Sequence, residues 1–322
     1  MKRFPRNPIL TRADLPDVPP RLVDPTSVFN PGAIAWDGGV ALLLRVQTRG
    51  RRTLLLVATS PDGERFRVRP RIVAIEGLAD AGEEVFHVYD PRLTRLGDDV
   101  FVVFAADVPG ACRLGIARTR DLERFELVSF DRSGDRRNGV LFPDRVQGRF
   151  ARLERPNRAA RPGDPASGEE IVLSLSEDLV SWREAGVVMR GRARYWDERI
   201  GSGPPPIRVE EGWLHVYHGV ATHFQSVNVY QAGVVLLDAE EPRKVLARTR
   251  DNVLEPRESW EMVGQVPNVV FPSGLVVPGL TPGEVAPRDA RVLVYYGAAD
   301  TCVGLAVTTV GELLDACGDD AG

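Results

Sequence analysis

The chain has 322 residues, of which 43% are hydrophobic, and its formal net charge is -4. This length and composition suffice for a large core, either in two domains or in one extended all-β unit. Its 41 basic and 45 acidic residues form no long run of one sign, which argues against nucleic-acid and membrane-surface partners.

The sequence shows no recognisable targeting signal and no disulfide or zinc pattern, which favours an intracellular protein. Two prolines interrupt the N-terminal stretch where a signal peptide needs an apolar core, and no later run approaches the ~20 apolar residues of a membrane span. Cys112, Cys302 and Cys317 lack CxxC spacing, which indicates neither a disulfide framework nor a zinc site. We therefore expect a cytoplasmic protein with no membrane partner.

A strand pattern recurs along the chain at intervals of roughly sixty residues. It consists of an apolar, β-branched segment that ends in a polar turn, at 53–60, 113–120, 171–178, 232–239 and 303–310. In the first three copies, an Asp and an aromatic residue four positions later follow the strand: Asp62/Phe66, Asp121/Phe125 and Asp178/Trp182. A second apolar run precedes each copy, so each unit contains a hairpin.

A proline-marked strand begins each unit. The five dipeptides are Asn30-Pro31, Asp90-Pro91, Phe142-Pro143, Pro205-Pro206 and Phe271-Pro272. With the hairpin and the aromatic-marked tail, this strand makes four strands per unit, which is the content of a propeller blade. A β-sandwich is the alternative, but it has no reason to repeat prolines and aromatics in register.

The sequence therefore predicts an all-β, five-bladed β-propeller in one domain over residues 1–322. We expect an N-terminal extension of about residues 1–25 on an outer face and a short C-terminal helix at about 311–317.

Equivalent positions of different blades face one another around the channel of a propeller. The proline-marked strands place Asn30 and Asp90 at equivalent positions. The middle strands end in Arg45, Ala105, Arg155, His218 and Gly297. An acid facing several cationic donors predicts a site for an anionic or multiply hydroxylated ligand. His215 and His218 lie three apart in a strand and point to opposite faces, so they cannot bind one metal ion.

Ordered motifs from about residue 28 to 306 together resemble glycoside hydrolase family 130, the β-mannoside phosphorylases. They include FNPGA (29–33), YDPRLT (89–94), RIGSGPPPI (199–207) and VYYGAAD (294–300). The resemblance implies a five-bladed propeller with Asp90 as the general acid. It implies a phosphate site at Arg137, Arg155, Arg199 and His218. It implies sugar contacts at Asn30, Arg45, Asn138, Tyr230 and Asp300. Many members have lysine where this chain has Arg199, and arginine differs from lysine in reach and geometry.

The implied reaction is inverting phosphorolysis of a β-1,2- or β-1,4-linked mannoside to α-mannose 1-phosphate. Inorganic phosphate is then the co-substrate, with no metal or other cofactor, and the partners are a small oligosaccharide and phosphate. A homo-oligomer is compatible with the sequence, and the polar 157–170 segment is a candidate for closing the acceptor side.

Two alternatives remain open from the residues. One is a phosphate-independent inverting β-mannosidase, whose second carboxylate would be Asp197, Glu198 or Glu261. The other is a non-catalytic carbohydrate-binding propeller.

Overall fold

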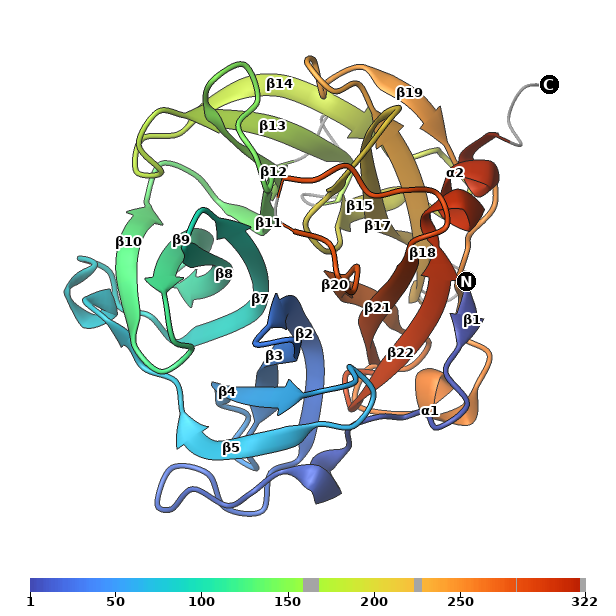
Figure 1. The fold of residues 1–322 in the computed structure, drawn as a ribbon. Coiled ribbons are helices and arrows are strands. Elements are labelled where there is room, and N and C mark those ends of the chain that lie inside the picture. Colours follow the sequence, from blue (N-terminus) through green and yellow to red (C-terminus); the bar gives the residue numbers. More distant parts are fainter. Residues whose placement is uncertain (159–167, 223–227, 282, 319–322) are drawn as a thin grey trace.

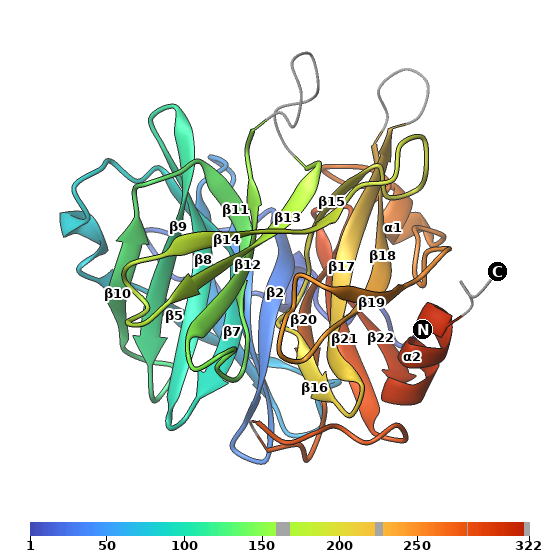
Figure 2. The same cartoon turned by 90° about the horizontal axis from the view of Figure 1, so that it is seen from above.

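The computed structural model describes residues 1–158, 168–222, 228–281 and 283–318. Five mostly antiparallel sheets stand around a central axis, each with the first strand of its four-strand repeat innermost (Figure 1). Seen at right angles, the inner strands run along that axis (Figure 2). The predicted all-β, five-bladed β-propeller is confirmed.

The blades follow one another in chain order. Blade 1 contains β2 (Ser27–Trp36), β3 (Gly39–Gln47), β4 (Thr53–Ser60) and β5 (Arg67–Ile72). Blade 2 contains β7 (His87–Leu96), β8 (Asp99–Val108), β9 (Ala111–Thr119), β10 (Phe125–Asp131) and the short β6 (Ile75–Glu76), which pairs in parallel with β10. Blade 3 contains β11 (Arg136–Leu141), β12 (Phe150–Pro156), β13 (Glu170–Ser176) and β14 (Arg183–Arg190).

The last two blades depart slightly from this plan. Blade 4 contains β15 (Arg199–Ser202), β16 (Ile207–Val209), β17 (Gly212–Thr222), β18 (Asn228–Leu237) and β19 (Val245–Arg248). Its inner edge is split, because β15 and β16 both pair with β17. Blade 5 contains β20 (Val270–Val276), β21 (Arg291–Ala298), β22 (Cys302–Thr309) and the N-terminal β1 (Lys2–Arg3). Short helices are η1 (Arg12–Asp14), η2 (Leu78–Asp80), α1 (Ser259–Met262) and α2 (Val310–Gly318), the last covering the predicted 311–317.

The N-terminal segment closes the ring of blades. Strand β1 pairs with β22 and is the outermost strand of blade 5. The first residues, expected on an outer face, therefore also form part of the sheet. The Arg3 guanidinium donates to both carboxylate oxygens of Glu261, at 2.8 and 2.7 Å. Asn7 donates to the Leu305 carbonyl and accepts from its N–H. These contacts join the two ends of the propeller.

Apolar clusters between neighbouring blades form the core. One joins Val216 and Val234 of blade 4 to Val294 of blade 5 and Leu313 of α2. Another joins blade 5 to blade 1 through residues such as Leu305 and Leu42. Because both faces of a blade are covered by its neighbours, the middle strands read as nearly continuous apolar runs.

The repeated aspartates have a structural role. Asp62 Oδ1 accepts the N–H groups of Glu64 and Arg65, and Asp121 and Asp178 accept the equivalent pairs. Each carboxylate thereby fixes the turn between the third and fourth strands of its blade. These hydrogen bonds lower the pKa of Asp62 to about 2.

A bulge recurs in the innermost strand of blades 1 to 3. The register shifts just after Phe29, Tyr89 and Arg137. Asn30, Asp90 and Asn138 occupy the bulges with φ of 45°, 50° and 53°. A left-handed backbone is uncommon for residues other than glycine, although Asn and Asp adopt it more readily than most.

This register corrects three of the five assignments made from proline. In blade 5, Phe271 pairs with Gly297 as Phe29 pairs with Arg45, so the equivalent of Asp90 is Pro272 and not Phe271. Phe142-Pro143 follows the end of β11, and Pro205-Pro206 lies between β15 and β16. The blade 3 residue equivalent to Asp90 is therefore Asn138, a third polar side chain in the ring, and the blade 4 equivalent is Ser202. The assignment of the middle strands is confirmed. In every blade, the predicted end residue of the middle strand pairs with the innermost-strand residue just before the position equivalent to Asp90. These end residues are Arg45, Ala105, Arg155, His218 and Gly297.

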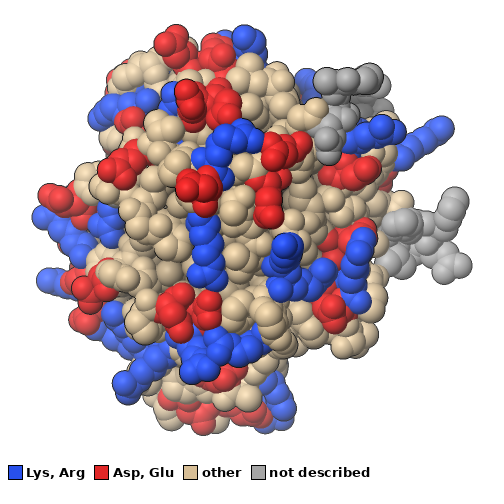
Figure 3. Space-filling view, turned by 45° about the vertical axis from the view of Figure 1, so that its right-hand side comes forward, with Lys and Arg blue, Asp and Glu red and all other residues tan. Residues whose placement is uncertain are grey.

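On the face that Figure 3 shows, acidic and basic side chains of the described residues are interspersed. Within the described ranges, no helix is long and apolar enough to cross a membrane.

Candidate functional site

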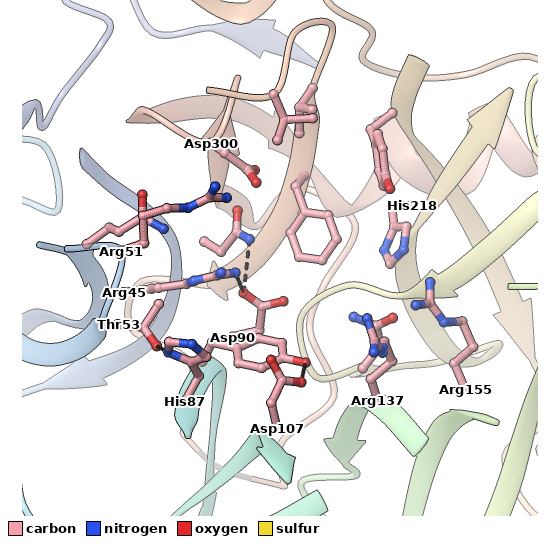
Figure 4. A pocket seen from close by; sticks show the side chains of 18 residues that line it. Arg45, Arg51, Thr53, His87, Asp90, Asp107, Arg137, Arg155, His218 and Asp300 are labelled. Carbon is pink, nitrogen blue, oxygen red and sulfur yellow. Dashed lines mark hydrogen bonds and ion pairs between the residues drawn. The ribbon is translucent and has the colours of Figure 1, made fainter. Parts of the chain in front are cut away.

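A cavity of about 550 Å³ opens at one end of the central channel, and every blade contributes to its wall (Figure 4). Of the ten residues predicted for the site, Arg199 is the one that does not line it. The other nine come together here: Asn30, Arg45, Asp90, Arg137, Asn138, Arg155, His218, Tyr230 and Asp300.

Asp90 lies near the centre of the cavity (Figure 4). Its Oδ1 accepts hydrogen bonds of 2.9 Å from Arg45 Nη1 and from Asn30 Nδ2. Burial alone would raise the pKa of Asp90, but the charges of Arg45 and Arg92 and these hydrogen bonds outweigh it and lower the pKa. Asp90 is therefore a carboxylate at neutral pH.

Arg92 fixes the backbone beneath Asp90. This fully buried side chain donates from Nε to the Gly203 carbonyl at 2.7 Å and from Nη1 to the Asp90 carbonyl at 2.9 Å. Its guanidinium carbon lies 5.4 Å from the centre of the Phe271 ring. Arg92 thus joins three blades and holds the bulge that carries Asp90.

A basic pocket lies across the cavity from Arg45 (Figure 4). Arg137 and Arg155 face each other in the β11–β12 ladder, with His218 close by on β17. Among the described residues, no carboxylate forms an ion pair with either arginine, and the Nε of each is buried without a hydrogen-bond partner. Burial, together with the Arg137 charge, lowers the pKa of Arg155 to about 10, so both remain cations.

His218 differs from the expectation of a cationic side chain. Burial lowers its pKa well below 6.5, and the charges of Arg155 and Arg92 act in the same direction. The ring is therefore neutral at pH 7 and can donate one hydrogen bond. It lies against Phe271, with the ring centres 4.5 Å apart. Gly201 makes room for it, because a Cβ there would lie 2.4 Å from the imidazole Cε1.

Asn138 and Tyr230 complete the wall around His218. Asn138 is buried, and its Oδ1 has no hydrogen-bond partner among the described residues. The Tyr230 ring lies 6.2 Å from the His218 ring. Both can therefore offer polar atoms to a ligand next to the basic pocket.

Two further carboxyl groups line the cavity. Asp107 accepts the Tyr89 hydroxyl at 2.7 Å. Asp300 lies in the turn between β21 and β22, and burial, with a smaller contribution from Asp90, raises its pKa to about 6. Asp90 and Asp300 thus have pKa values shifted in opposite directions within one cavity.

Arg199 lies beside the cavity. It starts β15 opposite Val220. Burial raises the pKa of Tyr230, and the Arg199 charge is one of those that oppose this rise. Its predicted contact with phosphate stays a prediction. Most of the 157–170 segment lies outside the described residues.

Sequence reasoning missed one side of the cavity, formed by Gln47, Arg51, Thr53 and His87. His87 Nδ1 lies 3.4 Å from Thr53 Oγ1, which joins blades 1 and 2 there. The alternation of side chains along a β-strand could have identified His87, because it places His87 on the same face of β7 as Tyr89.

The three carboxylates considered as a second catalytic base lie elsewhere. Asp197 is buried and pairs with Arg192 and Arg248. Glu261 pairs with Arg3 in blade 5. Glu198 accepts the N–H of Thr222. None of the three lines the cavity as the described residues define it.

Comparison with known proteins agrees with this geometry. The model of glycoside hydrolase family 130, described as beta-1,4-mannooligosaccharide phosphorylase, matches residues 1–319. The chain is 34% identical to a beta-1,4-mannooligosaccharide phosphorylase of Ruminococcus albus, over 97% of this chain and 89% of that protein. It is 28% identical to a 1,2-beta-oligomannan phosphorylase of Thermoanaerobacter sp. strain X514, over 89% and 91%.

A solved structure has the same fold. The beta-1,2-mannobiose phosphorylase from Listeria innocua, in complex with beta-1,2-mannobiose, gives a TM-score of 0.80 at 24% identity and covers 98% of this chain and 99% of that one.

Proposed function

The chain belongs to glycoside hydrolase family 130, and we propose that it is an inverting phosphorylase that cleaves a β-1,2- or β-1,4-linked mannoside with inorganic phosphate. The products are α-mannose 1-phosphate and a sugar shortened by one mannose. The similarity to phosphorylases of both linkages supports the class of substrate and leaves both linkages as candidates.

The basic pocket carries the proposal. Arg137 and Arg155 are cations without carboxylate partners among the described residues, and they lie across the cavity from Asp90. Two unpaired arginines suit a phosphate dianion, because their guanidinium groups can donate paired, charge-assisted hydrogen bonds. His218, as a neutral donor, adds another hydrogen bond to the same anion.

This arrangement lets phosphate act as the nucleophile. A bound dianion needs no second carboxylate to activate it, so the pocket has only to hold it in line with the anomeric carbon. A phosphate oxygen forms a bond to that carbon while the bond to the glycosidic oxygen breaks. Asp90 gives its proton to the leaving oxygen, and the proton of the hydrogen phosphate restores it.

The lowered pKa of Asp90 fits this cycle. Phosphate brings two negative charges into the cavity, and like charges favour the protonated form of a carboxyl group. Sugar binding also displaces water from Asp90. We propose that the acid becomes protonated only when the substrates are bound.

The phosphate-independent mannosidase is the second candidate. It would require a base opposite Asp90, and Asp107 and Asp300 are the other carboxyl groups in the cavity. Two unpaired arginines would have no role in such an enzyme. They would equally be unnecessary in a sugar-binding propeller without activity.

The remaining partners and the compartment are proposed on weaker grounds. Phosphate and an oligosaccharide are the partners, and within the described residues no group of three or more metal-ligating side chains is placed to hold a metal ion. The three cysteines are free and buried, which supports a reducing, cytoplasmic location.

The proposal is tested by incubating the purified protein with β-1,2- and β-1,4-mannobiose, with and without phosphate. We expect cleavage of at least one substrate that depends on phosphate and saturates with it. Equal release of mannose in both conditions would contradict phosphorolysis and favour the mannosidase.

A further inference from the structure

The turn that carries Asp300 is fixed in a strained conformation. Ala299 and Asp300 both have a left-handed backbone, with φ of 46° and 49°. Backbone hydrogen bonds hold the turn, from Ala299 N–H to the Val269 carbonyl at 3.1 Å and from Thr301 N–H to the Ala298 carbonyl at 2.9 Å. Such strain persists where surrounding contacts enforce it. Here it places the Asp300 carboxyl in the cavity wall (Figure 4).

The Asp300 carboxyl is not paired with another side chain among the described residues. Among the described residues, none donates a hydrogen bond to it or forms an ion pair with it. The cation whose charge acts on it is Arg45, which donates to Asp90 instead. The other charged or titratable groups near it in the cavity are Asp90 on β7, Arg51 in the β3–β4 turn and Tyr230 on β18.

The positive charge of Arg45 therefore acts on two carboxyl groups, those of Asp90 and Asp300. A sugar bound over them without phosphate would remove the water that solvates a charged Asp300, and Asp90, still a carboxylate in that complex, would oppose a second negative charge. A neutral carboxylic acid avoids both costs and can donate to a hydroxyl oxygen.

We infer that Asp300 binds the sugar as an uncharged carboxylic acid that donates a hydrogen bond to a sugar hydroxyl, and that sugar binding is therefore coupled to uptake of a proton. Asp300 was expected only to contact sugar, and that expectation left its charge and the direction of its hydrogen bond undefined.

The raised pKa of Asp300 supports the inference. With a pKa of about 6, Asp300 is mostly charged at pH 7 and mostly neutral at pH 5. Binding as the acid raises the pKa further, so at pH 7 each bound sugar takes up as much as about 0.9 of a proton. At pH 5 the uptake approaches zero. A carboxylate that accepted hydrogen bonds from the sugar would instead have its pKa lowered and would release protons near pH 6.

The inference rests on the proposed function in that the ligand is mannose, and it can fail separately. The test is calorimetric titration of the whole protein with mannose, without phosphate, in buffers of different ionisation enthalpy at pH 5, 6 and 7. The dependence of the heat on the buffer gives the protons exchanged. We expect uptake that grows from pH 5 to pH 7 in the wild-type protein.

Two variants assign the proton. Asp300→Asn keeps a donor without a titratable group, so it should bind mannose with no proton exchange. Asp107→Asn changes another cavity carboxyl and should retain the uptake. Proton release, no exchange in the wild type, or unchanged uptake in Asp300→Asn would each overturn the role of Asp300. The wild-type pH dependence decides the matter even if a variant fails to fold. Absence of mannose binding would contradict the proposed function itself.

Discussion

Arg45 of blade 1 donates a 2.9 Å hydrogen bond to Asp90 of blade 2, and this contact joins the two blades at the centre of the cavity. The same guanidinium lies 4.4 Å from the Phe29 ring centre and 4.8 Å from that of Tyr89. The aromatic rings limit its movement, so the position of Asp90 is set before substrate binds.

Replacement of Asp90 by asparagine should abolish most activity. The amide keeps the size of the carboxyl but cannot supply a proton, so we expect kcat to fall by about 10²- to 10⁴-fold. Phosphate should bind at least as tightly as before, because a negative charge has been removed. Steady-state kinetics and calorimetry measure the two effects. Retention of activity within tenfold would exclude Asp90 as the acid.

Arg155→Gln should act mainly on phosphate. Loss of a charged hydrogen-bond donor corresponds to about 1.5–3 kcal/mol, so the KM for phosphate should rise by roughly 10- to 150-fold with a smaller change in the KM for the mannoside. Arg118→Gln is the matched control, because Arg118 lies outside the cavity and pairs with Glu126 at the surface. Its effect should stay below about threefold by the same relation. A larger effect of Arg118→Gln than of Arg155→Gln would contradict our assignment of the pocket.

His215 should make the protein sensitive to acid. Burial, aided by the Arg92 charge, lowers its pKa to about 3, whereas the unfolded chain titrates near 6.5. The unfolded state thus binds a proton first as the pH falls, so the stabilisation is complete above pH 6.5 and is lost progressively toward pH 3. Thermal unfolding should show a Tm that falls over this range. His215→Gln should flatten that fall, and an unchanged pH dependence would refute this role.

Glu261→Gln should weaken the closure of the ring. Glu261 is fully buried and accepts from Arg3, Tyr296 and the N–H of Arg257. Leaving Arg3 without its carboxylate should cost about 3–5 kcal/mol of unfolding free energy, measured by denaturant titration. Because Glu261 lies outside the cavity, the KM values of the folded variant should stay unchanged. A loss of kcat with normal stability would instead support Glu261 as the second catalytic carboxylate of a β-mannosidase.

The repeat was enough to predict the fold, because each blade must place similar residues at similar turns. Asp62, Asp121 and Asp178 are spaced alike because each accepts the N–H groups of the same turn. The closure by β1 was not predictable from Lys2 and Arg3, since two residues carry no strand periodicity.

The site was harder to predict than the fold. Asn138 occupies a bulge like that of Asp90 but is followed by glycine, so a search guided by proline selected Phe142 instead. The neutral state of His218 follows from its burial beside Arg155. These two residues are distant in the sequence, so their contact could not be predicted from local sequence patterns. The same holds for Asp300, whose environment arises from three different blades.

The central claim is that phosphate, not water, attacks the mannoside. Proton and phosphorus NMR of one reaction, containing the cleavable mannobiose and excess phosphate, measures it most directly. We predict one α-mannose 1-phosphate for each sugar released, with no free mannose beyond the leaving unit. Free mannose from both units without a phosphate ester, or a β-configured ester, would contradict inverting phosphorolysis.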